Sequence, residues 1–195
     1  MRRFLFAAAL AALLALPSLS ASADTVTFKA PRPRLSPHDT ASASGAGLPV
    51  VIVYGRPHTA DPHTGAIRTV WGGQLVPVGQ VWRTGADEAT LLITGKTLTL
   101  GDGPATVTLP AGAYSLYTLM VSPDEAKLIV NHQVGQWGTH YDPSQDVGRV
   151  PLHEDTLEPA VHQFTIAVQK TGAASGVIKL QWESKQFSVP FTVTD

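Results

Sequence analysis

Hydrophobic residues recur along this chain in short segments, and in most segments they alternate with polar or small residues. The alternation is clearest towards the C-terminus, over residues 161–170, 177–183 and 187–194. A period of two places successive side chains on opposite faces of a β-strand, so each segment predicts a strand with one buried face. No segment keeps apolar residues at helical spacing over several turns, so the pattern indicates an all-β chain.

Further strands are expected wherever a short apolar run lies between glycine, proline or polar turn residues. These expected strands cover residues 25–30, 49–54, 80–84, 89–94, 97–100, 105–109, 113–121 and 127–131. Leu109-Pro110-Ala111-Gly112 fits a type I turn, with proline second and glycine fourth. Residues 135–149 are polar with isolated aromatic residues, and they are expected to form a loop.

Many short strands separated by glycine- and proline-rich turns predict an antiparallel β-sandwich or flattened barrel. The sequence shows no internal repeat and no second domain, so residues 49–195 are expected to form a single β-sandwich domain. Residues 24–48 are expected to form an extended N-terminal arm with a first edge strand, because prolines at 31, 33 and 37 fix φ and remove backbone donors. The predicted core includes Val51, Val53, Leu116, Leu180 and Trp182.

The N-terminal residues have the pattern of a secretory signal peptide. Arg2 and Arg3 precede an apolar segment over residues 4–16, and Ala21-Ser22-Ala23 fits a small-residue cleavage site. The alternative is an anchor helix, but the apolar segment is shorter than the roughly 20 residues that a membrane span needs. The sequence therefore predicts a signal peptide over residues 1–23, cleavage before Asp24, and a periplasmic or secreted protein without a transmembrane segment in its mature chain.

Composition excludes several kinds of chemistry. The chain has 195 residues, a formal net charge of −1 at pH 7 and no cysteine. It therefore has no disulfide bond, no thiol nucleophile, no thiolate zinc ligand and no cysteine for lipid attachment. The absence of a basic run argues against nucleic-acid binding, which needs positive charge opposite the phosphates. No phosphate-binding glycine loop leads into a helix and no G-x-S-x-G sequence occurs, so no cofactor is expected.

The stretch Trp71–Thr90 concentrates residues that could carry chemistry. It contains two of the four tryptophans, together with Arg83 and the adjacent acids Asp87 and Glu88. The planar fork of Arg83 could bind a carboxylate or sugar hydroxyls, and the acids could serve general acid–base chemistry. The alternative is a structural ion pair between Arg83 and Asp87 that braces the turn between them.

Trp71 and Trp137 fall in glycine-rich loop sequences, WGG and QWGT. A tryptophan in such a loop either closes the end of a sandwich or stacks on a ligand, and the sequence leaves both roles open. Trp182 alternates in phase with apolar neighbours and is therefore expected in the core.

His58, Asp61 and His63 lie close together in the sequence and could bind zinc. Nothing in the sequence makes these three loop side chains converge on one point, and the surrounding prolines stiffen the loop. Neither an HExxH sequence nor an acidic calcium loop occurs. The sequence therefore predicts no metal site.

Several phrases occur together in one order along the chain. They are SPH at 36–38, YGRP at 54–57, WGGQLVPVGQVWRTGADEAT at 71–90, LPAGAYSLYTL at 109–119, IVNHQVGQWGTHYD at 129–142, GRVP at 148–151, LQWES at 180–184 and VPFTV at 189–193. In these phrases the chain resembles the exported bacterial family catalogued as domain of unknown function 2911, from about Leu35 to Val193. The resemblance implies export and a β-rich domain, without an activity that can be transferred. His162 stands where the family commonly has an acid, so no role of that acid is carried over.

Three functional hypotheses follow. The chain is a binding module for a small polar ligand or an envelope glycan, a hydrolase-type enzyme that uses Asp87, Glu88 and His38, or a structural envelope protein without a ligand. A site is expected at a sandwich end, where polar groups and large aromatic residues occur in glycine-rich backbone. The candidate ligand-binding residues are Arg56, Trp71, Arg83, Asp87, Glu88, Trp137 and His38.

Overall fold

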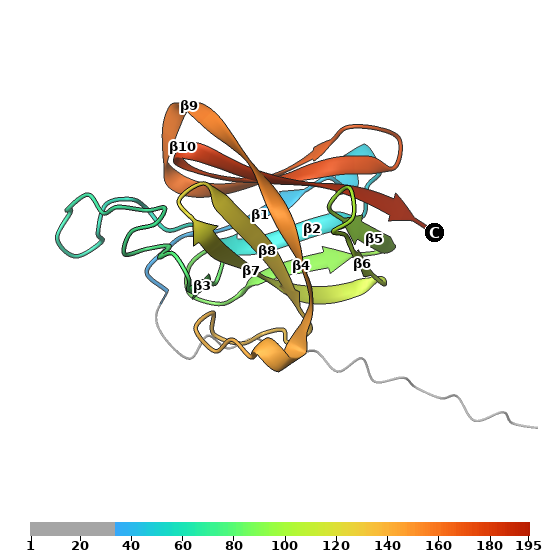
Figure 1. Cartoon of the computed structure of the whole chain (residues 1–195), viewed down its shortest axis with the longest axis horizontal. Coiled ribbons are helices and arrows are strands. Elements are labelled where there is room, and N and C mark those ends of the chain that lie inside the picture. The colour runs from blue at the N-terminus through green and yellow to red at the C-terminus, as the bar shows by residue number, and fades with distance from the viewer. Residues whose placement is uncertain (1–33) are drawn as a thin grey trace, which may run out of the picture.

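The computed structural model describes residues 34–195, which form an all-β domain (Figure 1). The signal peptide and the strand expected at residues 25–30 lie outside the described residues. The strands are β1 (His38–Ser42), β2 (Val50–Gly55), β3 (Val81–Trp82), β4 (Thr90–Thr94), β5 (Thr97–Leu100), β6 (Val107–Leu109), β7 (Gly112–Ser122), β8 (Glu125–Asn131), β9 (Asp146–Lys170) and β10 (Ser175–Thr194). Two short 3₁₀ helices, η1 (Ser44–Ala46) and η2 (Pro143–Gln145), lie in the connections.

The strands form one large antiparallel sheet in the order β1-β2-β4-β7-β8-β9-β10-β5-β6, with β3 paired to β7 off this path. The long strand β9 turns the sheet over on itself, because its first residues pair with β8 and its remainder pairs with β10. The hydroxyl of Tyr54 in β2 joins the two layers: it accepts a hydrogen bond from the Ile166 amide of β9 (2.9 Å) and donates to the Ile166 carbonyl (3.3 Å). The predicted antiparallel sandwich is confirmed, and the sheet remains open instead of closing into a flattened barrel.

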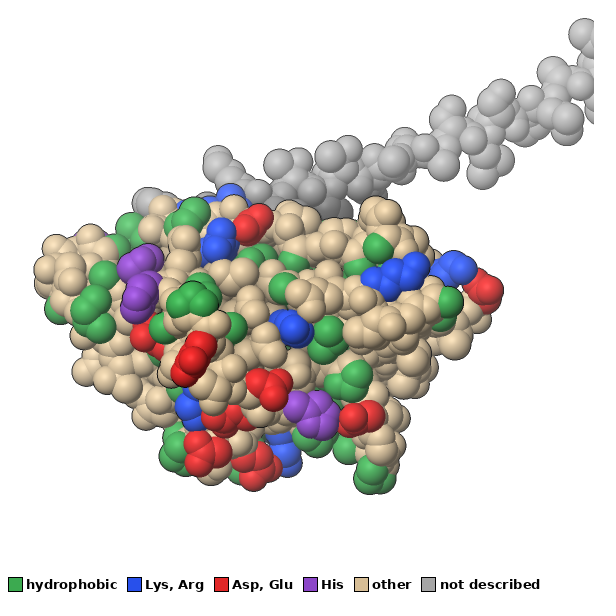
Figure 2. All heavy atoms as spheres, turned by 90° about the horizontal axis from the view of Figure 1, so that it is seen from above, with side chains coloured by type: hydrophobic (Ala, Val, Ile, Leu, Met, Phe, Trp, Pro, Cys, Tyr) green, Lys and Arg blue, Asp and Glu red, His purple; other side chains and the backbone are tan. Residues whose placement is uncertain are grey.

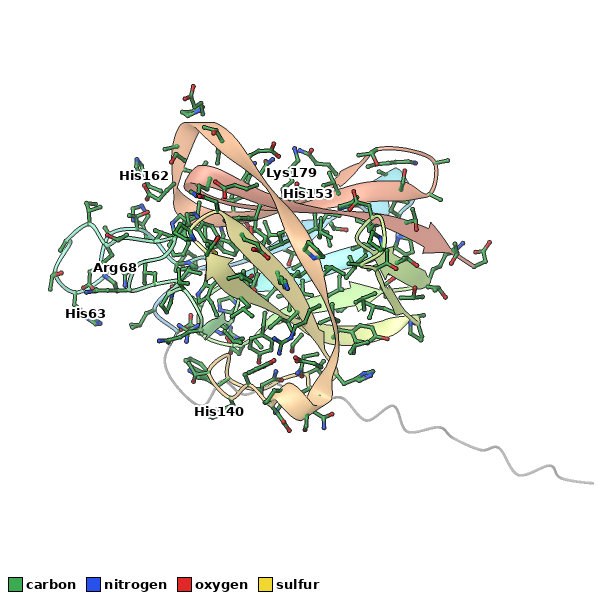
Figure 3. All side chains as sticks on the ribbon, in the orientation of Figure 1. His63, Arg68, His140, His153, His162 and Lys179 are labelled. Carbon is green, nitrogen blue, oxygen red and sulfur yellow. The ribbon has the colours of Figure 1, made fainter. Side chains whose placement is uncertain are left out.

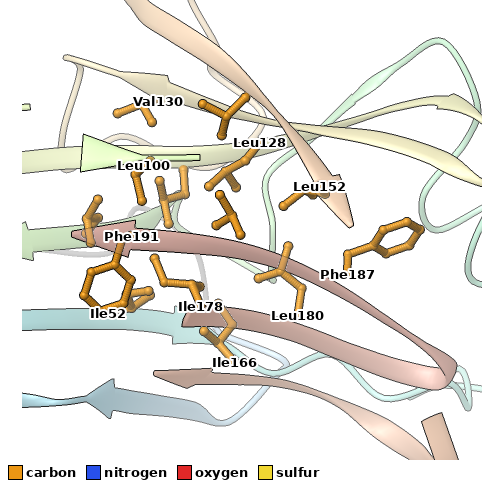
Figure 4. Packing of buried hydrophobic residues seen from close by; sticks show 14 of the residues in the cluster. Ile52, Leu100, Leu128, Val130, Leu152, Ile166, Ile178, Leu180, Phe187 and Phe191 are labelled. Atoms are coloured by element: carbon orange, nitrogen blue, oxygen red, sulfur yellow. The ribbon is translucent and has the colours of Figure 1, made fainter. Parts of the chain in front are cut away.

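The core lies between these two layers (Figure 4). In β10 the predicted alternation is confirmed, since Ile178, Leu180 and Trp182 are all buried. Leu116 of β7 is buried as well, as predicted. Burial of these apolar side chains supplies the main driving force for folding.

The prediction for β2 is wrong in phase. Val51 and Val53 are only half-buried, whereas Val50, Ile52 and Tyr54 face the core. The run PVVIVY is apolar throughout, so the sequence gives no polar residue from which to decide which alternate set faces inward.

Three further expectations about strands are wrong. Strand β1 was not anticipated, although it pairs with β2 and is part of the sheet. Strand β9 begins at Asp146, inside the region expected to be a loop, and continues to Lys170 without a break. Residues 177–183 and 187–194 belong to one strand, β10, which bends at register shifts between Gln181 and Lys185. Hydrogen-bond pairing with a neighbouring strand determines where such strands begin and end, and the local sequence pattern does not record this pairing.

Among residues 34–195, no helix is long and apolar enough to cross a membrane. Figure 2 shows the face formed by β9 and β10, on which basic side chains are scattered singly and acidic side chains gather in one area. Among the ion pairs of the described residues, Lys185 of β10 contacts Asp124 (2.9 Å) and Glu154 (2.7 Å).

Candidate functional site

A cavity of about 530 Å³ lies at the end of the sandwich from which the long loop of residues 56–80 projects, on the left in Figure 1. Its wall comes from five stretches of chain: the arm before β1, this long loop, β3 with the turn that follows it, the loop before η2, and Trp182 of β10. The polar lining residues are Ser36, Arg56, His58, Arg68, Gln74, Gln80, Arg83, Asp87, Thr139 and Tyr141. We call this cavity the Arg83 pocket.

The turn from Arg83 to Thr90 has a compact, braced conformation. Thr84 and Asp87 both adopt positive φ angles, 51° and 65°, which are uncommon for residues with a side chain. The Thr90 hydroxyl donates to the Thr84 carbonyl (2.7 Å), and the Thr84 hydroxyl lies 2.7 Å from that of Thr118 in β7. These contacts hold an unusual backbone in place, as is common at functional sites.

This turn packs directly on the end of β2. The amide of Ala86 donates to the carbonyl of Gly55 (3.2 Å), and a Cβ added at Gly55 would lie 2.3 Å from the Ala86 carbonyl oxygen. A Cβ at Gly85 would likewise lie 2.9 Å from the Gly55 oxygen. The two glycines therefore allow a close backbone approach that any side chain would prevent. The phrases YGRP and RTGADEAT, far apart in sequence, meet at this contact.

The loop that carries Trp137 packs on the same turn. Ala89 donates its amide to the Gln136 carbonyl (3.1 Å), and Gly138 donates to the Asp87 carbonyl (2.9 Å). A Cβ at Gly138 would meet Cδ and Cβ of Arg83 at 2.3 and 2.7 Å, so the aliphatic part of Arg83 lies directly on this glycine. The phrase QWGT therefore helps to hold the Arg83 side chain in position.

Arg83 is half-buried in the pocket wall. Its Nε donates weakly to the Gly85 carbonyl (3.4 Å), and its two terminal nitrogens make no hydrogen bond or ion pair within the described residues. Burial lowers the pKa of Arg83, and the charge of Asp87 acts in the opposite direction. The ion pair expected between Arg83 and Asp87 does not form, because the Asp87 carboxylate faces other groups.

Asp87 is buried, and its carboxylate faces the arm that precedes β1. One oxygen accepts a hydrogen bond from the Ser36 amide (3.4 Å) and lies 3.6 Å from Nε2 of His38. The same histidine nitrogen lies 3.4 Å from the Glu88 carboxylate. The structure thus brings His38, Asp87 and Glu88 together, as the hydrolase hypothesis requires.

Glu88 is held by Arg34, an arginine that no sequence pattern marked as a site residue. Arg34 donates from both Nε (3.0 Å) and Nη2 (2.7 Å) to the Glu88 carboxylate. Burial raises the pKa of Glu88, but the hydrogen bond from Arg34, a backbone hydrogen bond and the charges of Arg34 and His38 together lower it by more, so the net pKa is lowered. Glu88 and His38 border a second, smaller cavity of about 120 Å³ instead of the Arg83 pocket.

The other two arginines of the pocket are occupied by the protein. Arg56 donates to the Phe164 carbonyl (3.2 Å), the Thr165 hydroxyl (2.9 Å) and the Asp39 carboxylate (3.0 Å). Arg68, which was not predicted, donates to backbone carbonyls on its own loop and lies 3.6 Å from the Asp61 carboxylate. Their role in the described chain is to shape the loop around the pocket.

Trp71 closes the end of the sandwich. Its Nε1 donates to the Trp182 carbonyl (2.9 Å), and its ring packs edge-on against Phe187 (4.8 Å between centroids) and Trp82 (6.0 Å). Trp137 is buried, and its backbone bridges to Glu88.

The tryptophans that line the pocket are Trp82 and Trp182. All of the predicted site residues lie at one end of the domain, but only Arg56, Arg83 and Asp87 line the Arg83 pocket.

The loop that carries His63 and Arg68 projects from one end of the domain, and its polar side chains make local contacts (Figure 3). Nδ1 of His58 accepts from the Ala60 amide (3.0 Å), and Asp61 accepts from the amides of His63 (2.9 Å) and Thr64 (3.0 Å). Within residues 34–195, no group of three histidine or acidic side chains has a geometry suited to holding a metal ion.

In a comparison with known protein families, a family model described as "Protein of unknown function (DUF2911)" matches residues 36–191. No curated protein and no solved structure matches the chain.

Proposed function

The chain belongs to the family of proteins of unknown function DUF2911, whose description names no activity. From the geometry of the site, we propose that it is an exported module that binds a small polar ligand in the Arg83 pocket. An envelope glycan or a fragment of one is a ligand of this kind.

One observation carries the proposal. Arg83 lies in the wall of the cavity with its terminal nitrogens unused by the described chain, while Arg56 and Arg68 are engaged by other groups of the protein. Within the described residues nothing accepts from these two nitrogens, so the guanidinium bonds to whatever enters the cavity, either water or a ligand. A bound ligand would supply that acceptor.

The size and lining of the cavity support the same proposal. A volume of about 530 Å³ lies in the range of small-molecule sites, which combine apolar walls with a few polar groups. Here Leu75, Val81 and Trp82 provide apolar wall, and Gln74 and Gln80 are exposed at the pocket with side-chain amides that bond to no described residue. Such a site can bind both the body and the polar groups of a ligand.

The hydrolase hypothesis has one specific observation in its favour, the meeting of His38, Asp87 and Glu88. However, Nε2 of His38 is shielded from solvent, and Glu88 is bound by Arg34. A general base must reach the proton that it removes, and this histidine nitrogen does not face the open pocket. In the binding hypothesis, the contacts among these three residues hold the arm before β1 against the pocket wall.

Export is the second part of the proposal, and the pattern of residues 1–23 supports it. Mass spectrometry of the protein recovered from the periplasm should give a mature chain that begins at Asp24. Retention of the full-length chain in the cytoplasm would exclude export.

Binding is tested by a thermal-shift screen of the mature domain against sugars, peptidoglycan fragments and small acids. A ligand at a hundred times its Kd stabilises the folded state by about 2.7 kcal/mol, or roughly 5–11 °C for a domain of this size. Thr139 is exposed at the pocket, so Thr139→Trp should fill the cavity and abolish the shift without loss of folding. If the variant binds the same ligand equally well, the site lies elsewhere.

A further inference from the structure

We infer that the ligand of the Arg83 pocket carries a carboxylate group and that Arg83 holds this group through its two terminal nitrogens. The inference rests on the proposed binding function and goes further, because it names the chemical group and its partner.

The two terminal nitrogens of the Arg83 guanidinium have the geometry that binding a carboxylate requires. Since Nε is directed to the Gly85 carbonyl, the donors that remain are on Nη1 and Nη2, side by side in one plane. Neither nitrogen is among the fully buried unbonded polar atoms of the described residues, so solvent or a ligand can reach them. Two parallel N–H donors match the two oxygens of a carboxylate.

The guanidinium is also held in place before a ligand arrives. Its aliphatic stem lies against Gly138, which leaves no room even for a Cβ, and Gly138 is itself tied to Asp87 by a backbone hydrogen bond of 2.9 Å. A side chain fixed in this way loses little conformational entropy when it binds.

The charges around the pocket favour a single negative charge. Arg56 is paired with Asp39 and Arg68 lies near Asp61, so Arg83 is the lining arginine whose two terminal nitrogens the described residues leave unused. Asp87 acts on Arg83 only at a distance, since its carboxylate faces Ser36 and His38. A dianion such as a phosphate monoester would leave one charge without a partner, whereas a carboxylate would not.

One further donor lies on the pocket wall. Because Nδ1 of His58 accepts from the Ala60 amide, a neutral His58 carries its proton on Nε2. Nε2 of this exposed histidine is therefore a donor, and His58 lines the cavity. Apolar wall from Leu75, Val81 and Trp82 would contact the body of the ligand. A sugar acid and an aromatic acid both combine these features.

The test uses matched pairs of probes on the full mature chain. The acids are D-glucuronate, D-galacturonate and benzoate, and each is compared with its neutral carboxamide by ligand-observed NMR titration. We expect the acids to bind and each carboxamide to bind roughly ten- to a hundredfold more weakly, as the loss of a hydrogen bond to a charged group implies.

Variants assign the effect to Arg83. Arg83→Met keeps the apolar stem against Gly138 and removes the charge, and it should weaken acid binding by a similar factor. Lys179→Met removes a charge of the same sign from β10, on a residue outside the pocket lining, and should leave binding unchanged (Figure 3). The wild-type comparison of acid with carboxamide decides the question even if Arg83→Met does not fold.

Two results would overturn the inference. Equal binding of acids and carboxamides, lost in Thr139→Trp, would show a pocket that does not select a carboxylate, and the proposed binding function would survive. If no acid binds, the carboxylate inference is also overturned. The proposed binding function would then fail only if the wider ligand screen showed no ligand either.

Discussion

Gly55→Ala is the sharpest test of how this domain builds its pocket. The added Cβ would lie 2.3 Å from the carbonyl oxygen of Ala86, 2.9 Å from its carbonyl carbon and 3.1 Å from its nitrogen. All three contacts are with backbone atoms, which cannot move aside as a flexible side chain can. The turn between β3 and β4 would have to move away from the end of β2.

The expected cost follows from two terms. Forcing an extra carbon into a well-packed place costs typically about 1–3 kcal/mol. The hydrogen bond from the Ala86 amide to the Gly55 carbonyl (3.2 Å) would stretch or break, at about 0.5–1.5 kcal/mol. The sum is about 3 kcal/mol, which corresponds to a decrease in Tm of roughly 6–12 °C for a domain of this size.

Urea unfolding followed by tryptophan fluorescence measures this cost, because Trp71, Trp82 and Trp182 pack together near the turn. The matched control is Gly45→Ala in η1, where an added Cβ meets no atom within 4 Å and φ is not in the left-handed region. This control should stay within about 0.5 kcal/mol of the wild type.

The reasoning would be refuted if Gly55→Ala and Gly45→Ala unfolded at the same urea concentration with equal slopes. It would also fail if Gly55→Ala were destabilised but still bound a pocket ligand with unchanged affinity. In that case the position of the turn would not determine the shape of the pocket.

Three other predictions follow. Leu180→Ala should cost about 2–5 kcal/mol in urea unfolding, because the leucine is 1% exposed. Burial and Asp146 raise the pKa of Tyr141 to about 12, so ultraviolet titration should show a late-ionising tyrosine, and the stability that it contributes should be lost as the pH rises from 10 towards 12. Zinc calorimetry should show no sub-micromolar site in the loop of residues 57–63, since His58 Nδ1 and the Asp61 carboxylate already accept from backbone amides.

Each of these predictions has a contrary outcome. A change of only a few tenths of a kcal/mol for Leu180→Ala would place this leucine outside the core. An unaltered Tyr141 titration in Asp146→Asn would mean that the hydrogen bond to Asp146 (2.7 Å) does not contribute to the raised pKa. Tight zinc binding that is lost in His63→Ala would contradict the third prediction.

The contacts of Glu88 show why the candidate site could be predicted only in part. The acid was identified from the sequence, but its partner Arg34 lies 54 residues away, in a segment distinguished by its proline content instead of its charge. Arg83 was likewise identified, and its neighbour Asp87 was considered as an ion-pair partner, but the two side chains do not pair. Nearness along the chain is a poor guide here, because the left-handed backbone at Asp87 turns that carboxylate towards His38.

The sequence by itself determined the class of fold and the inward face of its clearest strand. Period-two alternation is a local property that the backbone converts directly into two faces, so the alternation alone assigns Leu180 and Trp182 to the core, where both are buried. The break between β6 and β7 at Pro110 follows in the same local way, because proline has no backbone N–H for a strand ladder.

The tertiary structure alone decided the phase of β2, the length of β9 and the environment of Arg83. An unbroken apolar run such as PVVIVY supports either phase, and only packing against the other layer selects Ile52 over Val51 and Val53. The pocket exists because Gly55, Gly85 and Gly138 allow separate backbone segments to approach closely. Such contacts depend on how distant segments meet in space, and no spacing along the chain records them.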